Sequence, residues 1–379
     1  MVVIGAGIVG AACAYFAARA GLRVVVVDRG PVAGGTTSAG EGNLLVSDKE
    51  PGPELALMQH SLRLWAEIGD RLGAEEIELE PKGGLVVAST AEALAALRDL
   101  GGRHRTEEVA VTDVAGAGLA DYEPHLAPDL AGGAHYPQDM QVQPMLATAH
   151  LLRAAVLEHG VDVRFGETVT GIDRGGDGRV VGVRTSAGSI ASPAVVNAAG
   201  VWAADVARLA GVDLPVLPRR GFILVTEPLP TLIRHKVYAA DYMAAVASDS
   251  AGLQTSPVIE GTRSGTVLIG SSRERVGFDR TVALPVLRRL AADAIRLFPV
   301  LARAHVLRTY HGFRPYAPDH LPLIGPDPRR PGLLHACGHE GAGIGLAPAT
   351  GDLVAALLTD APPAVEPSPF APSRLESHD

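Results

Sequence analysis

The feature that most constrains the fold is the opening stretch VVIGAGIVGAACAYFAARAGLRVVVVDRG. An apolar strand over residues 2–4 leads into G-x-G-x-x-G, and a run of helical composition follows as far as Gly21. A second apolar strand then ends at Asp28. Strand, glycine turn, helix, strand and acid in this order form the context that a dinucleotide-binding fingerprint requires. The stretch therefore predicts the first βαβ unit of a nucleotide-binding domain.

A secretion signal and a membrane anchor are the other interpretations of this stretch. The first 18 residues carry no charged side chain, and AARA resembles a signal-peptide cleavage site. However, a signal peptide begins with positive charge, which is missing here. The apolar run also stops near the lower limit for a spanning helix and holds three glycines at fixed spacing. We therefore favour the nucleotide-binding unit and expect no transmembrane segment.

Each position of the fingerprint has a physical role. Gly5 allows a sharp turn, Gly7 lets the backbone approach a pyrophosphate, and Gly10 lets the helix pack on the sheet. The helix start offers N–H groups and a partial positive charge to phosphates. Asp28 can accept hydrogen bonds from ribose hydroxyls, which favours a free 2′-hydroxyl. The nucleotide contacts predicted in this unit are Gly5, Gly7, Ile8, Val9, Gly10, Asp28 and Arg29.

Composition describes a globular chain and excludes several classes of partner. The 379 residues are enough for two domains, and the net charge of −9 argues against nucleic acid. The two cysteines, Cys13 and Cys337, indicate no disulfide framework and fit a cytoplasmic protein, with peripheral membrane association left open. Neither C-x-x-C nor H-E-x-x-H occurs, so we expect no metal site.

Helical and strand-like patterns alternate along the chain and predict two interleaved domains. We expect an α/β fold with a Rossmann-like domain, and an α+β second domain on a mostly antiparallel sheet. The nucleotide-binding domain is predicted from residues 1–75, 145–215 and 311–360. The substrate domain is predicted from residues 76–144 and 216–310. The segment 361–379 is rich in proline and polar residues and is predicted to be a disordered tail.

Four stretches carry a family resemblance: GAGIVG with Asp28, VVNAAGVWA, GFRPYAPDHLPLIGP and CGHEGAGIGLAPATG. In this order they resemble the FAD-dependent amine oxidoreductases of the D-amino-acid oxidase and glycine oxidase family. RHKVYAADYMAAVASD and GTVLIGSSRERVGFD are most similar to the flavin subunits of D-hydroxyproline dehydrogenase, opine oxidase and hydrogen cyanide synthase. The resemblance covers residues 1–360. One departure is that the first strand begins almost at Met1, so we expect a short edge of the sheet or further residues before Met1.

The resemblance implies FAD rather than NAD. Small residues in VVNAAGVWA let the backbone lie against the ribityl chain or pyrophosphate, although a plain strand-to-helix turn is the alternative. The loop that follows Asp28 and contains residues 36–38 is implied to bind phosphate and ribityl oxygens of the FAD; a flexible surface turn is the alternative. No histidine lies between Val2 and Met58 and Cys337 suggests packing, so we expect non-covalent FAD. The further cofactor contacts implied are Thr36, Thr37, Ser38, Gly42, Asn43, Leu44, Val169 through its backbone, Ala199, Gly200 and Trp202.

Two elements are implied to carry the chemistry. The arginine of GFRP, Arg314, would bind the substrate carboxylate with its planar fork; a structural ion pair is the alternative. GHEGAGIGLAPATG is a glycine-rich turn that opens a helix, whose positive end would stabilise negative charge on the flavin pyrimidine ring. His339 either flanks the edge of the flavin ring or is a turn residue whose hydrogen bonds are made within the protein. The backbone contacts implied here are those of Gly341, Ala342, Gly343 and Ile344.

The implied reaction is hydride transfer from the substrate α-carbon to flavin N5. The substrate would be a small amino or imino acid with a carboxylate, such as a D-amino acid, D-hydroxyproline, sarcosine or a glycine-like acid. Positioning itself lowers the barrier, so no dedicated base is required. Tyr242, and less surely Tyr238, would lie over the substrate or pack in the core, and Glu340 would receive the ammonium group. Glycine oxidase has an arginine where this chain has Gly341, which puts a simple glycine specificity in doubt.

Two other functions stay open at this stage. One is an NAD-linked dehydrogenase, against which the second nucleotide-contact stretch argues. The other is a non-catalytic subunit that holds flavin within a multi-subunit dehydrogenase, against which the intact Arg314 argues. The resemblance also implies partner subunits or a homo-oligomer.

Overall fold

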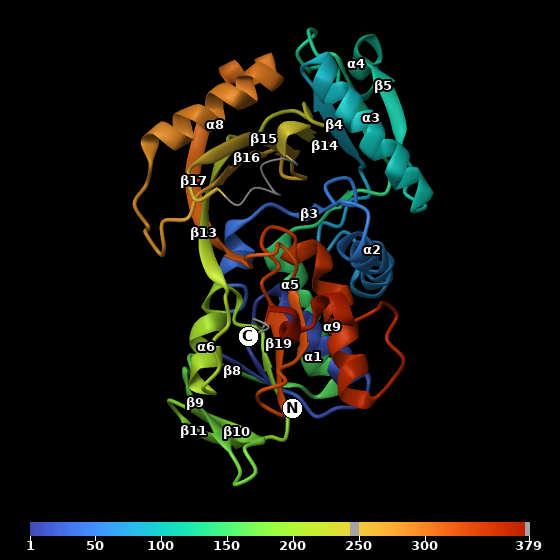
Figure 1. Cartoon of the computed structure of the whole chain (residues 1–379). Coiled ribbons are helices and arrows are strands. Elements are labelled where there is room, and N and C mark those ends of the chain that lie inside the picture. The colour runs from blue at the N-terminus through green and yellow to red at the C-terminus, as the bar shows by residue number, and fades with distance from the viewer. Residues whose placement is uncertain (243–249, 376–379) are drawn as a thin grey trace.

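The computed structural model describes residues 1–242 and 250–375 and places them in two parts around two large sheets (Figure 1). The first part holds a six-stranded sheet of order β18-β19-β12-β1-β2-β8, which is parallel except for β18. Its strands are short and mostly apolar, as expected of strands covered on both faces. They are β1 (Val2–Ile4), β2 (Val25–Asp28), β8 (Asp162–Phe165), β12 (Val195–Asn197), β18 (Leu323–Pro326) and β19 (Leu333–Cys337).

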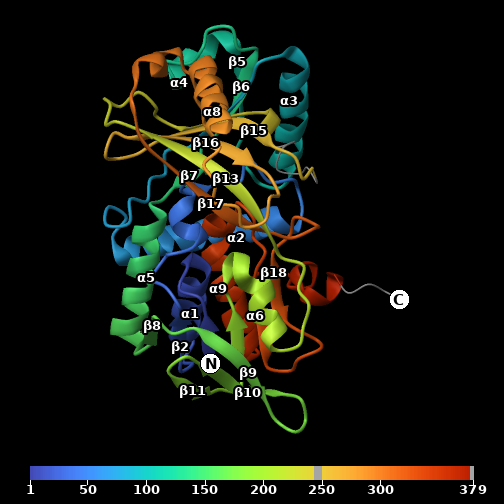
Figure 2. The same cartoon turned by 90° about the vertical axis from the view of Figure 1, so that its left-hand side faces the viewer.

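Helices cover one face of this sheet and a small sheet covers the other. The helical layer consists of α1 (Ile8–Arg19), α2 (Pro53–Leu72), α5 (Pro144–His159) and α9 (Gly343–Thr359), which share one apolar core. The opposite face packs against α6 (Ala203–Leu209) and a three-stranded antiparallel sheet, seen at the bottom of Figure 2. The strands of that sheet are β9 (Val169–Arg174), β10 (Val180–Thr185) and β11 (Gly188–Ala191).

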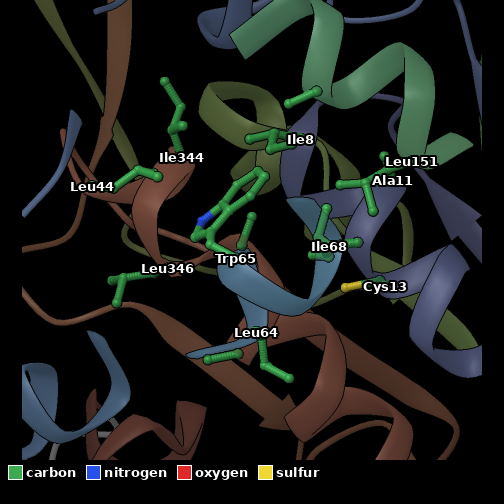
Figure 3. Close-up of a cluster of buried hydrophobic side chains, with 14 of the residues drawn as sticks. Ile8, Ala11, Cys13, Leu44, Leu64, Trp65, Ile68, Leu151, Ile344 and Leu346 are labelled. Carbon is green, nitrogen blue, oxygen red and sulfur yellow. The ribbon is translucent and has the colours of Figure 1, made fainter. Parts of the chain in front are cut away.

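Trp65 of α2 anchors the first turn of α9. Figure 3 shows its ring among side chains of α1, such as Ile8, and of α9, such as Ile344. Trp65 Nε1 and Ser61 Oγ both donate hydrogen bonds to the carbonyl oxygen of Gly345, at 3.1 and 2.5 Å. Trp65 is fully buried, so this contact fixes where α9 begins.

The second part is built on an eight-stranded sheet of order β17-β13-β16-β15-β14-β4-β6-β5. Neighbouring strands are antiparallel except β14 and β4. In Figures 1 and 2, β13 and β17 extend from this sheet toward the first part. The strands are β4 (Gly84–Ala88), β5 (Thr112–Ala115), β6 (Gly132–Tyr136), β13 (Leu217–Thr226), β14 (Lys236–Ala239), β15 (Gln254–Gly261), β16 (Val267–Arg273) and β17 (Val306–Tyr316).

Short elements complete the second part and connect it to the first. α8 (Leu284–Leu297) packs against β13, β15 and β16, and α3 (Ala91–Thr106) packs against β4 and β6. α4 (Leu119–Tyr122) is a single turn. A two-stranded sheet of β3 (Asn43–Leu44) and β7 (Met140–Gln141) lies between the parts. Within the described residues, no helix combines the length and apolar character needed to cross a bilayer.

The predicted α/β class, the Rossmann-like sheet and the mostly antiparallel second sheet are confirmed. Three details differ from expectation. β1 is a central strand rather than an edge, since it pairs with β12 and β2. The predicted boundary at residue 311 falls inside β17 because GFRP is the end of one long strand. Residues 361–375 are not a disordered tail, because Phe370 is buried and Arg374 pairs with Asp319; residues 376–379 lie outside the described residues.

Candidate active site

A cavity of about 400 Å³ lies where the carboxyl ends of the parallel strands meet the eight-stranded sheet. Ile4, Asp28 and Cys337 line it from the ends of β1, β2 and β19. Phe313 and Arg314 of β17 line it from the other side. Ligands of open parallel sheets bind outside the carboxyl ends of the strands, so this is the expected place for a nucleotide cofactor.

Two helices begin at this cavity. α1 follows Gly7 and α9 follows Ala342, and neither of these N-cap residues makes a side-chain capping hydrogen bond. Helix starts of this kind present N–H groups and a partial positive charge, which suit phosphate or a developing anion. Gly7, Ile8 and Val9 line the cavity from α1, and Gly341, Gly343 and Ile344 line it from α9.

The fingerprint glycines keep the start of α1 close to the sheet. Gly5 has a φ of +116°, and a Cβ there would overlap with the carbonyl oxygen of Ala198 in the turn after β12. A Cβ on Gly10 would overlap with the carbonyl oxygen of Gly5. Gly10 therefore serves helix-to-sheet packing and is not part of the cavity lining, although it was predicted among the cofactor contacts.

Asp28 holds the turn after β2 and still faces the cavity. Its two carboxylate oxygens accept hydrogen bonds from the N–H groups of Ala6 and Gly30, each at 2.7 Å. A carboxylate has about four acceptor positions, so further hydrogen bonds from ribose hydroxyls are compatible with these two. Beside it, the guanidinium of Arg29 lies 4.5 Å from the ring centroid of Trp202.

The early loop places two threonines at the cavity and turns its serine away. Thr37 Oγ1 accepts from the N–H of Ile8 at 3.1 Å, and Thr36 Oγ1 donates to the carbonyl of Phe313 at 2.7 Å. Ser38 is exposed and bonds back to Gly35. Further along, a side chain on Gly42 would overlap with the backbone of Val142, and Leu44 is a core residue (Figure 3).

The cavity gathers most of the predicted site residues. Those that do not line it are Gly10, Ser38, Gly42, Leu44 and Ala342. Those that line it are Gly5, Gly7, Ile8, Val9, Asp28, Arg29, Thr36, Thr37, Asn43, Val169, Ala199, Gly200, Trp202, Tyr242, Arg314, His339, Glu340, Gly341, Gly343 and Ile344.

Arg314 lies across the neighbouring strand with its guanidinium in the cavity wall. Nη1 donates a 2.8 Å hydrogen bond to the carbonyl of Ser272, and the described chain offers it no carboxylate within ion-pair distance. Burial, and next the charge of Arg273, lower the pKa of Arg314. A Cβ on Gly221 of β13 would overlap with the guanidinium. Sequence reasoning missed Gly221, because only the pairing of β13 with β17 brings it under Arg314.

Replacing Gly221 by alanine should displace the Arg314 guanidinium and lower kcat/KM for the acid that the sequence resemblance implies as substrate by about 10²-fold, since a shift of about 1 Å costs that much in a positioned site. The measurement is steady-state kinetics on protein that retains as much of the implied FAD as wild type. Gly102→Ala is the matched control, because Gly102 lies in α3 with open space around its Cβ position. Equal activity of the two variants would contradict the prediction.

Glu340 and His339 are both committed to protein partners. Arg219 Nη1 and His320 Nδ1 each bond one carboxylate oxygen of Glu340, at 2.5 and 3.1 Å. Burial opposes ionisation, but the hydrogen bond from His320 and the charge of Arg219 outweigh it and lower the pKa of Glu340 to about 2. The geometry therefore gives no support to Glu340 as acceptor of the substrate ammonium group.

His339 Nε2 bonds the hydroxyl of Thr350 at 2.9 Å, and that hydroxyl donates to the carbonyl of Leu346. Nε2 therefore carries the proton. Burial lowers the pKa of His339 to about 3, so the ring is neutral. These contacts favour the interpretation that His339 is a turn residue whose hydrogen bonds are made within the protein, rather than a residue that contacts the edge of the flavin ring.

The ion pair of Glu340 should make stability depend on acid pH. Its folded pKa of about 2 lies below the ordinary value of 4.5, so the stabilisation is complete above pH 4.5 and is lost as the pH falls toward 2. The loss amounts to about 3 kcal/mol of unfolding free energy. Urea unfolding at a series of pH values should give a steeper acid decline for wild type than for Glu340→Gln. Parallel curves would refute the assignment.

The two tyrosines have different surroundings. Tyr242 lines the cavity and is 7% exposed. Tyr238 is fully buried, and its hydroxyl donates to Ser47 Oγ at 2.7 Å. Its ring centroid lies 5.2 Å from that of Tyr242, so it supports Tyr242 from within the core. Tyr238 therefore packs in the core, which was the alternative to its lying over the substrate. Tyr242 lines the cavity, where it is in a position to contact a substrate.

Sequence reasoning missed a buried charge cluster beside the cavity, composed of Lys236, Glu260 and Glu41. Lys236 Nζ lies 2.6 Å from Glu260 Oε2 and 3.6 Å from Glu41 Oε2. Glu41 lines the cavity, and burial raises its pKa. Oε1 of Glu41 has no hydrogen-bond partner within the described residues. A lysine inside the apolar strand KVYA was the signal that could have revealed the cluster.

Comparison with known proteins places the chain among flavoproteins. It is similar to glycine oxidase of Pseudomonas putida, with 32% identity over 98% of both chains. It is also similar to hydrogen cyanide synthase subunit HcnC of Pseudomonas protegens, with 35% identity over 68% of this chain and 58% of that subunit. The crystal structure of glycine oxidase from Geobacillus kaustophilus has a TM-score of 0.86 and 29% identity, covering 100% of this chain and 98% of that one.

The residues of the cavity fit an FAD. Two helix starts meet there, small residues such as Gly7 and Gly200 leave the backbone accessible, and Asp28 lies at the nucleotide end. Val169 and Glu167 line the same end, while Arg314 lies toward the eight-stranded sheet. Residues 1–357 match the family described as FAD dependent oxidoreductase. The chain belongs to this family of FAD-dependent oxidoreductases.

Proposed function

We propose that the chain oxidises the C–N bond of a small amino or imino acid. The observation that carries the proposal is the Arg314 guanidinium, which is buried in the cavity wall and bonded there only to a backbone carbonyl among the described residues. Such a group stabilises a bound carboxylate strongly, because a planar fork matches two carboxylate oxygens. The similarity to glycine oxidase supports an amino acid as the molecule whose carboxylate binds Arg314.

The chain's own residues orient the acid and support the developing charge. Arg314 fixes the carboxylate and so directs the α-carbon, and orientation of this kind lowers a barrier without a dedicated base. The start of α9 directs its dipole into the cavity, where it stabilises negative charge as it forms. FAD, when bound, supplies the acceptor for the substrate hydride.

We infer that the FAD is held without a covalent bond. The described part of residues 2–58 contains no histidine, and Cys337 is fully buried at the cavity. Burial raises the pKa of the Cys337 thiol to about 12, and a thiol in this state is a poor nucleophile. Acid precipitation should therefore release all the yellow colour into the supernatant, whereas colour retained in the pellet would contradict this inference.

We also infer an assembly with partner subunits or with further copies of the chain. The support is the similarity to a subunit of hydrogen cyanide synthase. Cys13 and Cys337 are both buried free thiols, which supports a cytoplasmic location. Size-exclusion chromatography with light scattering on the protein purified from its natural host would test the assembly, and a monomer would contradict it.

Anaerobic titration tests the activity directly. The protein should be yellow, and one member of a panel of D-amino acids, proline derivatives, sarcosine, glycine and opines should bleach it before air is admitted. A colourless protein that binds NAD would favour an NAD-linked dehydrogenase. A yellow protein that no acid bleaches would favour a non-catalytic subunit. Either result would overturn the proposal.

A further inference from the structure

Glu41 offers the cavity a carboxylate that the protein leaves only partly bonded. It lies in the loop before β3, lines the cavity and is 8% exposed. Its Oε2 accepts a hydrogen bond from Asn43 Nδ2 at 3.2 Å, whereas its Oε1 has no hydrogen-bond partner within the described residues. Rotation about the last side-chain bond exchanges the two oxygens, because this torsion has a broad minimum. A buried oxygen without a donor is costly, so the site favours a ligand that brings N–H groups.

The cluster around Glu41 carries more carboxylates than cations. Lys236 Nζ lies 2.6 Å from Glu260 Oε2 but 3.6 Å from Glu41 Oε2. Glu260 also accepts a hydrogen bond from the N–H of Gly42, and it is not among the described residues that line the cavity. One lysine balances one of the two carboxylates. The carboxylate that borders the cavity, Glu41, is therefore the one left for a cationic group of a ligand.

The loop that carries Glu41 is fastened to the strand that carries Arg314. The hydroxyl of Tyr310, on β17, donates a hydrogen bond to the carbonyl oxygen of Gly40 at 3.2 Å. Burial acts most strongly on the pKa values of Glu41 and Arg314, but each of these groups also favours the charged form of the other. The cavity thus presents a carboxylate and a guanidinium near each other, and this pattern is complementary to the zwitterion of an amino acid.

We propose that Glu41 binds the ammonium group of the substrate and accepts its proton, while Arg314 holds the carboxylate. The inference rests on the proposed function, because it assigns a residue to the amine of the acid that is oxidised. The amine must first be neutral, since its lone pair forms the new C=N bond as the hydride leaves the α-carbon. The proton passes from nitrogen to a carboxylate oxygen of Glu41, so an N–H bond breaks, an O–H bond forms and no electrons are transferred in this step.

The roles of the two cavity charges are then distinct. Arg314 orients the α-carbon, so no base is needed for its hydrogen, and Glu41 prepares the nitrogen. The sequence suggested Glu340 for the ammonium group, but both oxygens of Glu340 are already bonded to Arg219 and His320.

Flavin reduction over a pH series separates proton transfer from a structural role. Glu41→Gln leaves one carboxylate against Lys236, so the variant should fold and retain FAD. Near pH 7 its flavin should be reduced about 10²-fold more slowly than that of wild type, because it lacks the proton acceptor. The rate should rise toward that of wild type as higher pH neutralises the amine of the acid in solution.

Glu260→Gln is the matched control, because it makes the same change in the same cluster without touching the cavity lining. It should keep the rate and the pH profile of wild type. Equal rates and profiles in Glu41→Gln and Glu260→Gln would overturn the proposal.

The other groups that face the Glu41 carboxylate do not produce such a profile. They are Lys236, Glu260, Tyr310 and Arg314. Burial opposes the charge of Lys236, but the charges of Glu260 and Glu41 outweigh it and raise the pKa of Lys236; burial raises the pKa of Tyr310. Both groups therefore keep their protons near neutral pH, and an arginine stays protonated. The Glu260→Gln control tests the remaining carboxylate.

Binding of acids that have no α-hydrogen gives a readout without turnover. The pairs are 2-aminoisobutyrate with pivalate, and 1-aminocyclopropanecarboxylate with 1-methylcyclopropanecarboxylate, in which a methyl group replaces the ammonium group. Isothermal titration of the yellow protein should show at least one amino acid binding about 30-fold or more tightly than its partner, and Glu41→Gln should bind the two alike. No preference in wild type, whether both acids bind or neither does, or the same preference in Glu41→Gln, would overturn the proposal.

The two measurements distinguish this inference from the proposed function. If no acid reduces the flavin but wild type alone prefers the amino acid, the proposed function fails and the ammonium site at Glu41 stands. If acids reduce the flavin but Glu41→Gln matches wild type in pH profile and in binding, the ammonium site fails and the proposed function stands.

Discussion

Arg314→Met should lower kcat/KM for oxidation of the acid by about 30- to 5,000-fold, while the protein stays yellow. Removing one member of a charged pair in a closed site costs about 2–5 kcal/mol. Most of that loss should appear in kcat/KM, because the same contact binds the acid and directs its α-carbon. FAD should be retained, since the nucleotide end of the cavity is built from other elements, including the turn at Asp28.

Arg308→Met is the matched control for this variant. Arg308 lies on the same strand, β17, but its side chain is exposed and outside the cavity lining. The measurement is the rate of flavin reduction by the acid in a stopped-flow instrument without oxygen, because this isolates the step in which the bound acid is oxidised. The proposed function would lose its basis if the flavin of Arg314→Met were reduced at the same rate as the flavin of Arg308→Met, with the same dependence of that rate on acid concentration.

The nucleotide-binding half of the site was predictable because its signals are local. The fingerprint from Gly5 to Gly10 fixes strand, turn and helix within one stretch, and Asp28 ends the next strand. The turn before α9 is equally local, since a glycine-rich run precedes a long apolar helix. Periodicity and turn chemistry act over a few residues, so they can be read without knowledge of the tertiary structure.

The substrate half of the site depends on strand pairing, which no local pattern specifies. Gly221 lies beneath Arg314 because Gly221 and Gly312 are paired in the register of β13 and β17. Arg273 reaches Tyr242 only through the placement of β16 in the same sheet. Long-range register of this kind brings together residues more than 30 positions apart, so the sequence shows each residue but not which residues lie next to it.

Composition misled the prediction for the segment after α9. Residues 361–375 are rich in proline, which lowers the propensity for helix and strand. The segment is nevertheless fixed by a few tertiary contacts. Phe370 is 1% exposed, and the guanidinium of Arg374 donates to Asp319 and to the carbonyl of Leu321. Burial of one aromatic side chain contributes about 1.5–3 kcal/mol, which helps to order a short segment without regular structure.

Lys236→Met should destabilise the protein by about 3–5 kcal/mol, because it leaves buried carboxylates without their cation. Lys236 is fully buried, and among the described residues Glu260 keeps only the N–H of Gly42 as a donor once Nζ is gone. Since Glu41 belongs to the same cluster and lines the cavity, the loss should also loosen the loop that carries Thr36 and Thr37. Urea unfolding and the dissociation constant of FAD measure the two effects.

Arg71→Met provides the control, because the Arg71–Glu158 pair is exposed and its loss should cost at most about 1 kcal/mol. Combining Lys236→Met with Glu260→Gln should recover part of the stability, since the amide of glutamine leaves no charge to be balanced at that position. If the single variant were as stable as the control, Lys236 would not be the cation that stabilises the buried carboxylates of Glu260 and Glu41.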